Sequence, residues 1–211
     1  FRPTDPTEAR KRLGMTSFSP LIGFVGGFPE QRGGLELLEV TKRLLGDYPS
    51  IGVAVVGKCD SGALHRKAKE LGILDRAVLP GLVPYESVPD YVNSFDIGFA
   101  TGDLHWSGRV GNSYQKVRQY LACGKPVVTC VSKDSPLGKS GLVECVTPGD
   151  VEMIEAAARR ILARDQHQRL TQREDAIRVA NEKYSSAATL RQRMKLWGEV
   201  ISQEAPRAKA A

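Results

Sequence analysis

Six short apolar runs, separated by segments with helical periodicity, dominate the first 150 residues. The runs are Leu21 to Val25, Gly52 to Val56, Ala77 to Leu79, Ile97 to Ala100, Pro126 to Cys130 and Leu142 to Val146. Uninterrupted runs of this length are typical of strands that are buried on both faces. The segments between them are long enough for the helical crossovers that parallel strands require. The pattern predicts an α/β fold with a Rossmann-like, doubly wound, mostly parallel sheet of about six strands.

Helical periodicity replaces the strand pattern after Asp150, which has the side chain of a helix N-cap. We therefore expect C-terminal helices after the sheet. The last of them carries an apolar stripe formed by Leu190, Met194, Trp197 and Ile201. Such a stripe requires a surface to cover it, and the null expectation is the core of the same domain.

Composition fits one well-buried core, since the chain has 211 residues, of which 41% are hydrophobic and 26% charged. The formal charge of +6 is compatible with phosphate ligands, an anionic membrane surface or nucleic acid. Much of the excess lies near the ends, in Arg10, Lys11 and Arg12 and again after Arg191. We interpret these runs as solvated helix faces, with membrane contact as the second choice, and expect no nucleic acid because aromatic residues do not accompany them.

The metal-binding residue types are scattered. Cys59, Cys123, Cys130 and Cys145 have no paired short spacing, and the three histidines form no cluster. We expect free thiols in a reducing compartment and no metal site. No run has the length of a membrane span and no signal peptide is visible, although a fragment would have lost one. The composition agrees with a cytosolic enzyme domain, so we expect a cytoplasmic protein.

The carboxyl ends of the predicted strands are where a doubly wound sheet binds its ligand. The loop after the first strand, residues 26–34, begins with Gly26 and Gly27, carries Arg32 and ends with two more glycines. Glycines let the backbone approach a ligand and a basic side chain attracts anions, so this loop can hold a diphosphate. The alternative is a flexible strand-to-helix turn with an exposed arginine.

A second candidate is the short helix that begins near Lys116. Val117, Tyr120 and Leu121 form one apolar stripe, and Ser113 is the expected N-cap. Gly124 has the conformational freedom to end the helix before the next strand starts at Pro126.

The segment from Lys116 through Gln119, Tyr120, Leu121, Ala122, Cys123, Gly124, Lys125, Pro126, Val127 and Val128 resembles the core signature of glycosyltransferase family 4, the retaining enzymes of the GT-B fold. Further pieces follow in the family's order. They are Phe1 to Gly14, Leu21 to Gly26, Val55 to Gly57, Gly81 to Pro84 and Pro148 to Asp150. The resemblance covers nearly all 211 residues, but only one half of a GT-B enzyme, the second, is present.

This resemblance implies three regions and one activity. Residues 1–18 are the interdomain linker and first helix, residues 19–184 the domain that binds the donor, and residues 185–211 a closing helix and tail. In such enzymes the closing helix returns to the first domain, so we expect its apolar stripe to be only partly covered in this chain. The activity is transfer of a sugar from a nucleotide diphosphate sugar, UDP- or GDP-linked, with retention at the anomeric carbon and without a metal cofactor. The acceptor would be bound by a missing first domain, in polysaccharide or glycolipid biosynthesis, with peripheral contact at the inner face of the membrane. The chain alone is expected to bind nucleotide and transfer no sugar.

The resemblance also implies the site residues. Arg32 and Lys116 are the phosphate stabilisers. The donor-binding set is Gly26, Gly27, Arg32, Gly57, Leu82, Val83, Arg109, Gly111, Asn112, Ser113, Lys116 and Gln119.

Four positions depart from the family pattern. Gly27 stands where the family has an arginine, Arg32 where it has a lysine, and Gly111 and Gln119 where it has two glutamates. Gln119 can hydrogen-bond a ribose hydroxyl, whereas Gly111 cannot replace a carboxylate beside the sugar.

Two other hypotheses stay open. A degenerate, non-catalytic nucleotide-binding or interaction module explains Gly27, Gly111 and Gln119 together. A GT-B nucleotide-sugar epimerase uses the same cleft but needs an acid/base pair, for which only Asp103 and His105 are available in this half. Trp106 either stacks on a ligand or holds its own loop. Asp96, which precedes the fourth strand, is expected to be structural.

Overall fold

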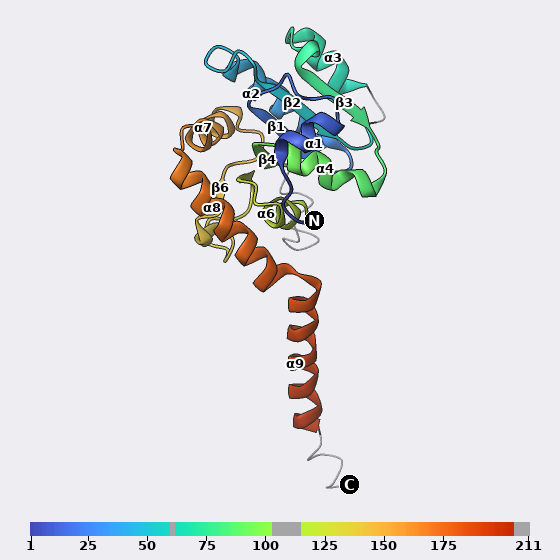
Figure 1. Ribbon diagram of the computed structural model, residues 1–211. Coiled ribbons are helices and arrows are strands. Elements are labelled where there is room, and N and C mark those ends of the chain that lie inside the picture. The colour runs from blue at the N-terminus through green and yellow to red at the C-terminus, as the bar shows by residue number, and fades with distance from the viewer. Residues whose placement is uncertain (60–61, 103–114, 205–211) are drawn as a thin grey trace.

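The computed structural model describes residues 1–59, 62–102 and 115–204 of the chain (Figure 1). Its centre is a six-stranded sheet in the order β3-β2-β1-β4-β5-β6, and all five strand pairings are parallel. The strands are β1 (Leu21–Val25), β2 (Gly52–Val56), β3 (Ala77–Gly81), β4 (Ile97–Ala100), β5 (Val127–Thr129) and β6 (Val143–Cys145). The predicted Rossmann-like doubly wound sheet is therefore confirmed, with every strand pairing parallel.

The strand bounds follow the apolar runs closely. Strands β1, β2 and β4 have the bounds that their apolar runs predict, and β1 and β2 are buried at all five positions. Strand β3 continues to Gly81, whereas β5 and β6 have three residues each. The order of the strands reverses between β1 and β4, where the chain turns from one half of the sheet to the other. This switch point is where ligands bind in open α/β sheets.

Helices cover both faces of the sheet. The α-helices of the described residues are α1 (Pro6–Arg12), α2 (Gly34–Leu44), α3 (Ala63–Glu70), α4 (Val88–Ser94), α6 (Gln115–Ala122), α7 (Val151–Leu162), α8 (Gln166–Val179) and α9 (Ser186–Glu204). Four short 3₁₀ turns, η1 (Pro29–Gln31), η2 (Leu74–Arg76), η3 (Tyr85–Ser87) and η4 (Gly138–Ser140), lie between them, and a π-helical turn, η5 (Ala180–Tyr184), joins α8 to α9.

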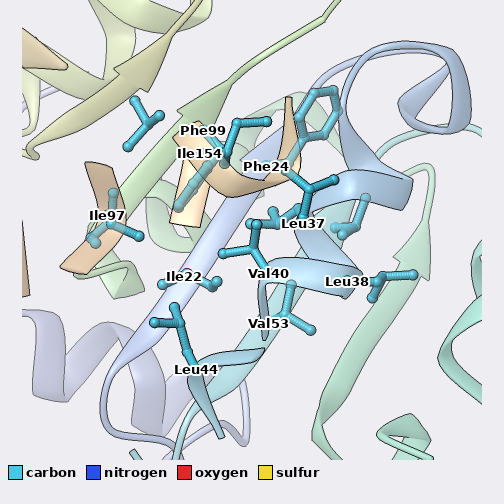
Figure 2. Packing of buried hydrophobic residues seen from close by; sticks show 14 of the residues in the cluster. Ile22, Phe24, Leu37, Leu38, Val40, Leu44, Val53, Ile97, Phe99 and Ile154 are labelled. Atoms are coloured by element: carbon cyan, nitrogen blue, oxygen red, sulfur yellow. The ribbon is translucent and has the colours of Figure 1, made fainter. Parts of the chain in front are cut away.

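The hydrophobic core consists of two clusters, one on each face. On the first face, α2, α3 and α7 pack over residues that include Ile22, Phe24 and Leu37 (Figure 2). On the second face, α4, α6 and α8 pack over residues that include Val25 and Tyr120. The predicted apolar stripe of the Lys116 helix belongs to this second cluster, since Val117, Tyr120 and Leu121 are buried. Gly124 ends that helix in the left-handed conformation (φ 69°), as predicted.

Arg10 of α1, which the sequence predicted to lie on a solvated helix face, anchors this helix through hydrogen bonds. The Arg10 guanidinium donates to Asp96 Oδ2 at 2.7 Å and to the carbonyls of Ser94 and Phe18. Asp96 Oδ2 also accepts from the Leu21 amide at 2.6 Å. The interpretation of Arg10 was wrong, because the packing of α1 against α4 is not visible in local sequence. The expected structural role of Asp96 agrees with these bonds.

The C-terminal helices begin as predicted, since Asp150 accepts from the Met153 amide at 2.8 Å and caps α7. Helix α9 then extends away from the α/β layers (Figure 1). Its apolar stripe is exposed, with Trp197 at 63% and Ile201 at 69% of their full accessible surface. The alternative in which the domain's own core covers this stripe is therefore wrong, and the exposure agrees with the expectation that the closing helix is only partly covered.

Candidate functional site

Three glycines terminate neighbouring strands at the carboxyl edge of the sheet. Gly26 follows β1 and Gly57 follows β2, both with φ 150°. Gly81 is the last residue of β3 and has φ 73°. The Gly26 amide donates to the Val56 carbonyl and the Gly57 amide to the Gly81 carbonyl, both at 2.9 Å. A Cβ at Gly57 would collide with the carbonyl oxygen of Gly26. The strand ends therefore approach one another closely and present backbone rather than side chains, as a ligand-binding edge requires.

The loop after β1 is packed against the end of β4. A Cβ at Gly33 would collide with the Thr101 hydroxyl, and a Cβ at Gly102 would lie 2.9 Å from Arg32 Cα. Phe28 adopts the left-handed conformation at φ 52°, which is rare for a bulky residue. Arg32 itself is partly buried. The alternative of a flexible turn with an exposed arginine does not fit this packing.

Lys116 reaches the same place from the other face of the sheet. It lies in the first turn of α6, whose apolar stripe packs on the second face, but its ammonium lies 3.7 Å from the ring centroid of Phe24, a member of the first cluster. A Cβ at Gly26 would lie 2.8 Å from Lys116 Nζ. The lysine side chain therefore crosses the carboxyl end of β1.

Electrostatics at this point favour an anion. Burial, and secondarily the charge of Arg32, lower the pKa of Lys116 from 10.5 to about 7. Two cations from different elements thus act on one another at a glycine-lined strand end. A negatively charged ligand would relieve both effects, because it supplies the opposite charge that the burial of an ammonium requires.

Tyr120 holds α6 in position, a role that the sequence analysis did not assign. Its buried hydroxyl accepts from the Val25 amide at 2.9 Å and donates to the Phe99 carbonyl at 3.2 Å. It therefore bridges β1 and β4 at the switch point, and burial raises the pKa of its hydroxyl. The sequence signal was a tyrosine inside an apolar stripe, because a buried hydroxyl needs hydrogen-bond partners.

Other buried polar atoms near the loop also went unnoticed in the sequence. Within the described parts of the chain, the Thr101 hydroxyl and one carboxylate oxygen each of Glu30 and Glu36 are buried without a hydrogen-bond partner. Thr101 follows β4, Glu30 lies in η1 and Glu36 in the first turn of α2. No sequence pattern distinguishes them from ordinary surface residues.

Some of the remaining predicted site residues lie within the part of the chain that the structure describes, and others lie outside it. Leu82 is 77% exposed and Val83 is partly buried, directly after β3. Gln119 is partly buried on α6, three residues after Lys116. The other predicted residues, Arg109, Gly111, Asn112 and Ser113, lie outside the described residues, as do Asp103, His105 and Trp106.

The described ranges, residues 1–59, 62–102 and 115–204, contain neither a cluster of metal ligands nor a helix that could span a membrane. No three histidine, cysteine or acidic side chains gather there in a way that would hold a metal ion. Cys59, Cys123, Cys130 and Cys145 are all free thiols. None of the helices in those ranges combines the length and apolar content needed to cross a bilayer.

Comparison with known proteins identifies the family. Residues 19–164 match the family Glycosyl transferases group 1, so the chain belongs to this family of transferases. The D-inositol 3-phosphate glycosyltransferase of Geodermatophilus obscurus is 32% identical over 180 residues, which cover 78% of this chain and 38% of the relative. The chain therefore spans well under half the length of that relative.

Several solved structures share the fold, two of them named as glycosyltransferases. HepE from Anabaena, solved in complex with UDP, superposes with a TM-score of 0.74 at 17% identity, over 94% of this chain and 54% of its own. A glycosyltransferase from Rickettsia africae gives a TM-score of 0.75 at 12% identity, over 95% and 56% of the two chains. The C-terminal domain of LpcC from Francisella tularensis, a glycosyl transferase group 1 protein, gives 0.70 at 16% identity, over 88% and 96%.

Proposed function

We propose that this chain is the donor-binding half of a retaining, metal-independent GT-B glycosyltransferase. The donor is a nucleotide diphosphate sugar, bound across the carboxyl ends of β1 and β4. The observation that carries the proposal is the convergence of Arg32 and Lys116 on the glycine-lined end of β1, at the switch point of a parallel sheet. Helix and strand termini at such points are well suited to phosphate groups.

The chemistry proposed for the two cations is stabilisation of the leaving group. When the sugar leaves, negative charge develops on the diphosphate, and fixed cations near that oxygen lower the energy of the transition state. Arg32 offers a fork of N–H donors and Lys116 a compact ammonium. Both are held by the fold before the ligand arrives, so little reorganisation is required. Gly26 and Gly27 leave room for the phosphates beside them.

For the nucleoside, we propose contacts at the ends of β2 and β3. Gly57 offers backbone, and the exposed Leu82 and its neighbour Val83 offer an apolar surface on which a base can lie. Gln119 is proposed to hydrogen-bond the ribose. UDP is the first choice of nucleotide because HepE, which shares the fold, was solved with UDP and with UDP-glucose.

The acceptor site, and with it turnover, is assigned to a second domain. The chain covers 38% of its relative from Geodermatophilus obscurus, and its exposed α9 stripe is proposed to pack on that second domain. We propose that the complete enzyme works in the cytoplasm, at the inner membrane face, in the synthesis of a polysaccharide or glycolipid. The 211-residue chain alone is proposed to bind donor nucleotide without transferring sugar.

A second candidate is a degenerate module that binds no nucleotide. The glycine at position 27 favours it, because the loop there carries no side chain toward the ligand. Calorimetric titration of UDP, GDP and ADP into the purified chain separates the two functions. Saturable binding of one nucleotide, weakened by Arg32→Ala and not by Arg160→Ala at the β6 edge, where Arg160 pairs with Glu144, supports the donor half. No binding by any nucleotide at millimolar concentration contradicts it.

A further inference from the structure

Phe28, in the loop after β1, has a backbone conformation that does not suit its side chain. Its φ of 52° and ψ of 53° lie in the left-handed region, where a Cβ crowds the backbone. Among the described residues, every other one with a positive φ is a glycine. Pro29 follows, and the residue before a proline favours extended backbone. The position therefore disfavours phenylalanine on two counts.

The packing of the loop imposes this conformation. The Phe28 carbonyl accepts from the Gln31 amide at 3.0 Å and closes the turn η1, in which Pro29 is buried. The Pro29 carbonyl accepts from the Arg32 amide at 3.1 Å, and a Cβ at Gly34 would lie 2.7 Å from the Pro29 oxygen. The backbone on the C-terminal side of Phe28 is thus fixed by its neighbours. A glycine would adopt the same conformation without strain.

The hydrophobic core does not account for the phenylalanine either. Its side chain is 48% exposed, and it belongs to neither of the two core clusters. A half-exposed ring gains only part of the stabilisation that a buried one gains. Strained residues that the fold does not require cluster at ligand sites. The combination of a strained backbone and an exposed ring therefore indicates a contact with a ligand.

The order of the strands shows which part of a donor lies near this loop. Along the ligand edge the order is β3, β2, β1 and β4. The proposed function places the nucleoside at the ends of β3 and β2 and the phosphates at the end of β1. The sugar is joined to the phosphate farthest from the nucleoside, so it lies toward β4. The loop that carries Phe28 packs against the end of β4, since a Cβ at Gly33 would collide with the Thr101 hydroxyl.

We propose that Phe28 binds the transferred sugar, with its aromatic ring packed against the C–H groups on one face of a hexose. The inference deepens the proposed function and rests on it. The C–H groups of a hexose ring form an apolar patch, and an aromatic side chain removes such a patch from water. The contact adds to the affinity for the sugar nucleotide and adds nothing to the affinity for the nucleotide product. It selects for a hexose without requiring a particular one.

The test compares a nucleoside diphosphate with its glucose ester by calorimetry, in the 211-residue chain and in four variants. The pair is UDP with UDP-glucose, or the corresponding GDP or ADP pair where that nucleotide binds. Phe28→Ala removes the ring, Phe28→Gly removes it and also suits the backbone conformation, and Phe28→Tyr keeps the ring. Leu170→Ala on α8 is the matched control, because Leu170 is also 48% exposed.

The expected result is a selective loss of affinity for the sugar nucleotide. A contact that buries about 30–80 Å² of apolar surface is equivalent to about three- to thirtyfold in affinity. Phe28→Ala and Phe28→Gly should weaken the glucose ester by that factor and leave the free diphosphate nearly unchanged. Phe28→Tyr and Leu170→Ala should leave both affinities nearly unchanged. A ring that only shapes the loop would instead affect both ligands equally.

Three outcomes overturn the inference while the proposed function stands. In the first, Phe28→Ala and Phe28→Gly bind the glucose ester as tightly as the unaltered chain does. In the second, they weaken the diphosphate and the glucose ester by the same factor, which assigns Phe28 to the shape of the loop. In the third, the unaltered chain binds the diphosphate but not its glucose ester. If the unaltered chain binds no nucleotide, the inference and the proposed function both fail.

Discussion

At the scale of single residues, the site depends on side chains that each connect two elements. Tyr120 joins α6 to both β1 and β4 through one hydroxyl, and Lys116 crosses from α6 to the ring of Phe24. The sequence placed Tyr120 in the core and Lys116 at a phosphate, but it did not reveal the hydroxyl bridge. Hydrogen bonds between residues 95 positions apart depend on the packed fold, and local patterns do not contain them.

Removing the Tyr120 hydroxyl should lower the stability of the fold while the ring keeps its packing. Tyr120→Phe keeps the ring in the core and leaves the buried Val25 amide without its acceptor, so the free energy of unfolding should fall by about 1–3 kcal/mol. Urea denaturation measures it. Tyr85→Phe, at an exposed position, is the matched control and should change nothing. Equal effects of the two substitutions would mean that the hydroxyl bridge contributes no stability.

For Lys116, which is proposed to bind phosphate, removing the charge of the side chain should raise the stability of the unliganded chain rather than lower it. Its pKa is about 7 in the folded chain and 10.5 when unperturbed, so between these pH values the unfolded chain binds more protons and stability rises with pH. Lys116→Met removes the cost of burying the charge, and this advantage is largest below pH 7. The unliganded variant should melt several degrees higher at pH 6.5, since 1 kcal/mol shifts Tm by about 2–4 °C in a domain of this size.

The difference in Tm between the variant and the unaltered chain should shrink as pH rises toward 10. Burial also lowers the pKa of Lys125, to about 8, so Lys125 contributes its own pH dependence to the stability of both proteins. The difference in Tm between the variant and the unaltered chain cancels that contribution. Thermal melts followed by circular dichroism at pH 6.5, 8 and 9.5 measure it. A variant that melts lower than the unaltered chain at every pH would show that Lys116 supports the fold.

At the scale of elements, the sequence was most informative where a segment is buried on two sides. The apolar runs of β1, β2 and β4 matched the observed bounds because every position in them faces a packed layer. Helix ends were also predictable, since Asp150 and Gly124 carry their capping chemistry locally. The docking of α1 was missed, because a short basic helix has the same sequence pattern whether it is solvated or anchored.

The two arginines of α1 give a matched pair of substitutions. Arg10 is 14% exposed and makes bonds to Asp96 and to two backbone carbonyls, whereas Arg12 is 49% exposed and pairs with Asp90. Arg10→Met should lower the free energy of unfolding by about 2–3 kcal/mol, because it removes the ion pair with Asp96 and the hydrogen bonds from Arg10 to the two carbonyls. Arg12→Met should leave it nearly unchanged. If both substitutions cost the same, in urea denaturation at equal pH and salt, α1 is not anchored through Arg10.

At the scale of the whole molecule, the chain is one α/β domain with an apolar helix that extends beyond it. The sequence predicted that α9 carries an apolar stripe, but not where the helix goes, because amphipathic patterns specify a face and not its partner. The family match over residues 19–164 covers the sheet and the site and ends before α9. The predicted boundaries at residues 18 and 184 stay predictions. The residues proposed to bind the donor all lie within this matched range, so donor binding should not require α9.

Nuclear magnetic resonance of the ¹⁵N-labelled chain during a titration with UDP tests the central claim most directly. The account predicts saturable shifts in the amides at the ends of β1, β2 and β3 and at the start of α6, including Gly26, Gly57 and Val117. It predicts none along the β6 edge, where Glu144 pairs with Arg160 and Arg164. Shifts confined to that distant edge, or no saturable shift at millimolar UDP, would contradict a donor site at the β1–β4 switch point.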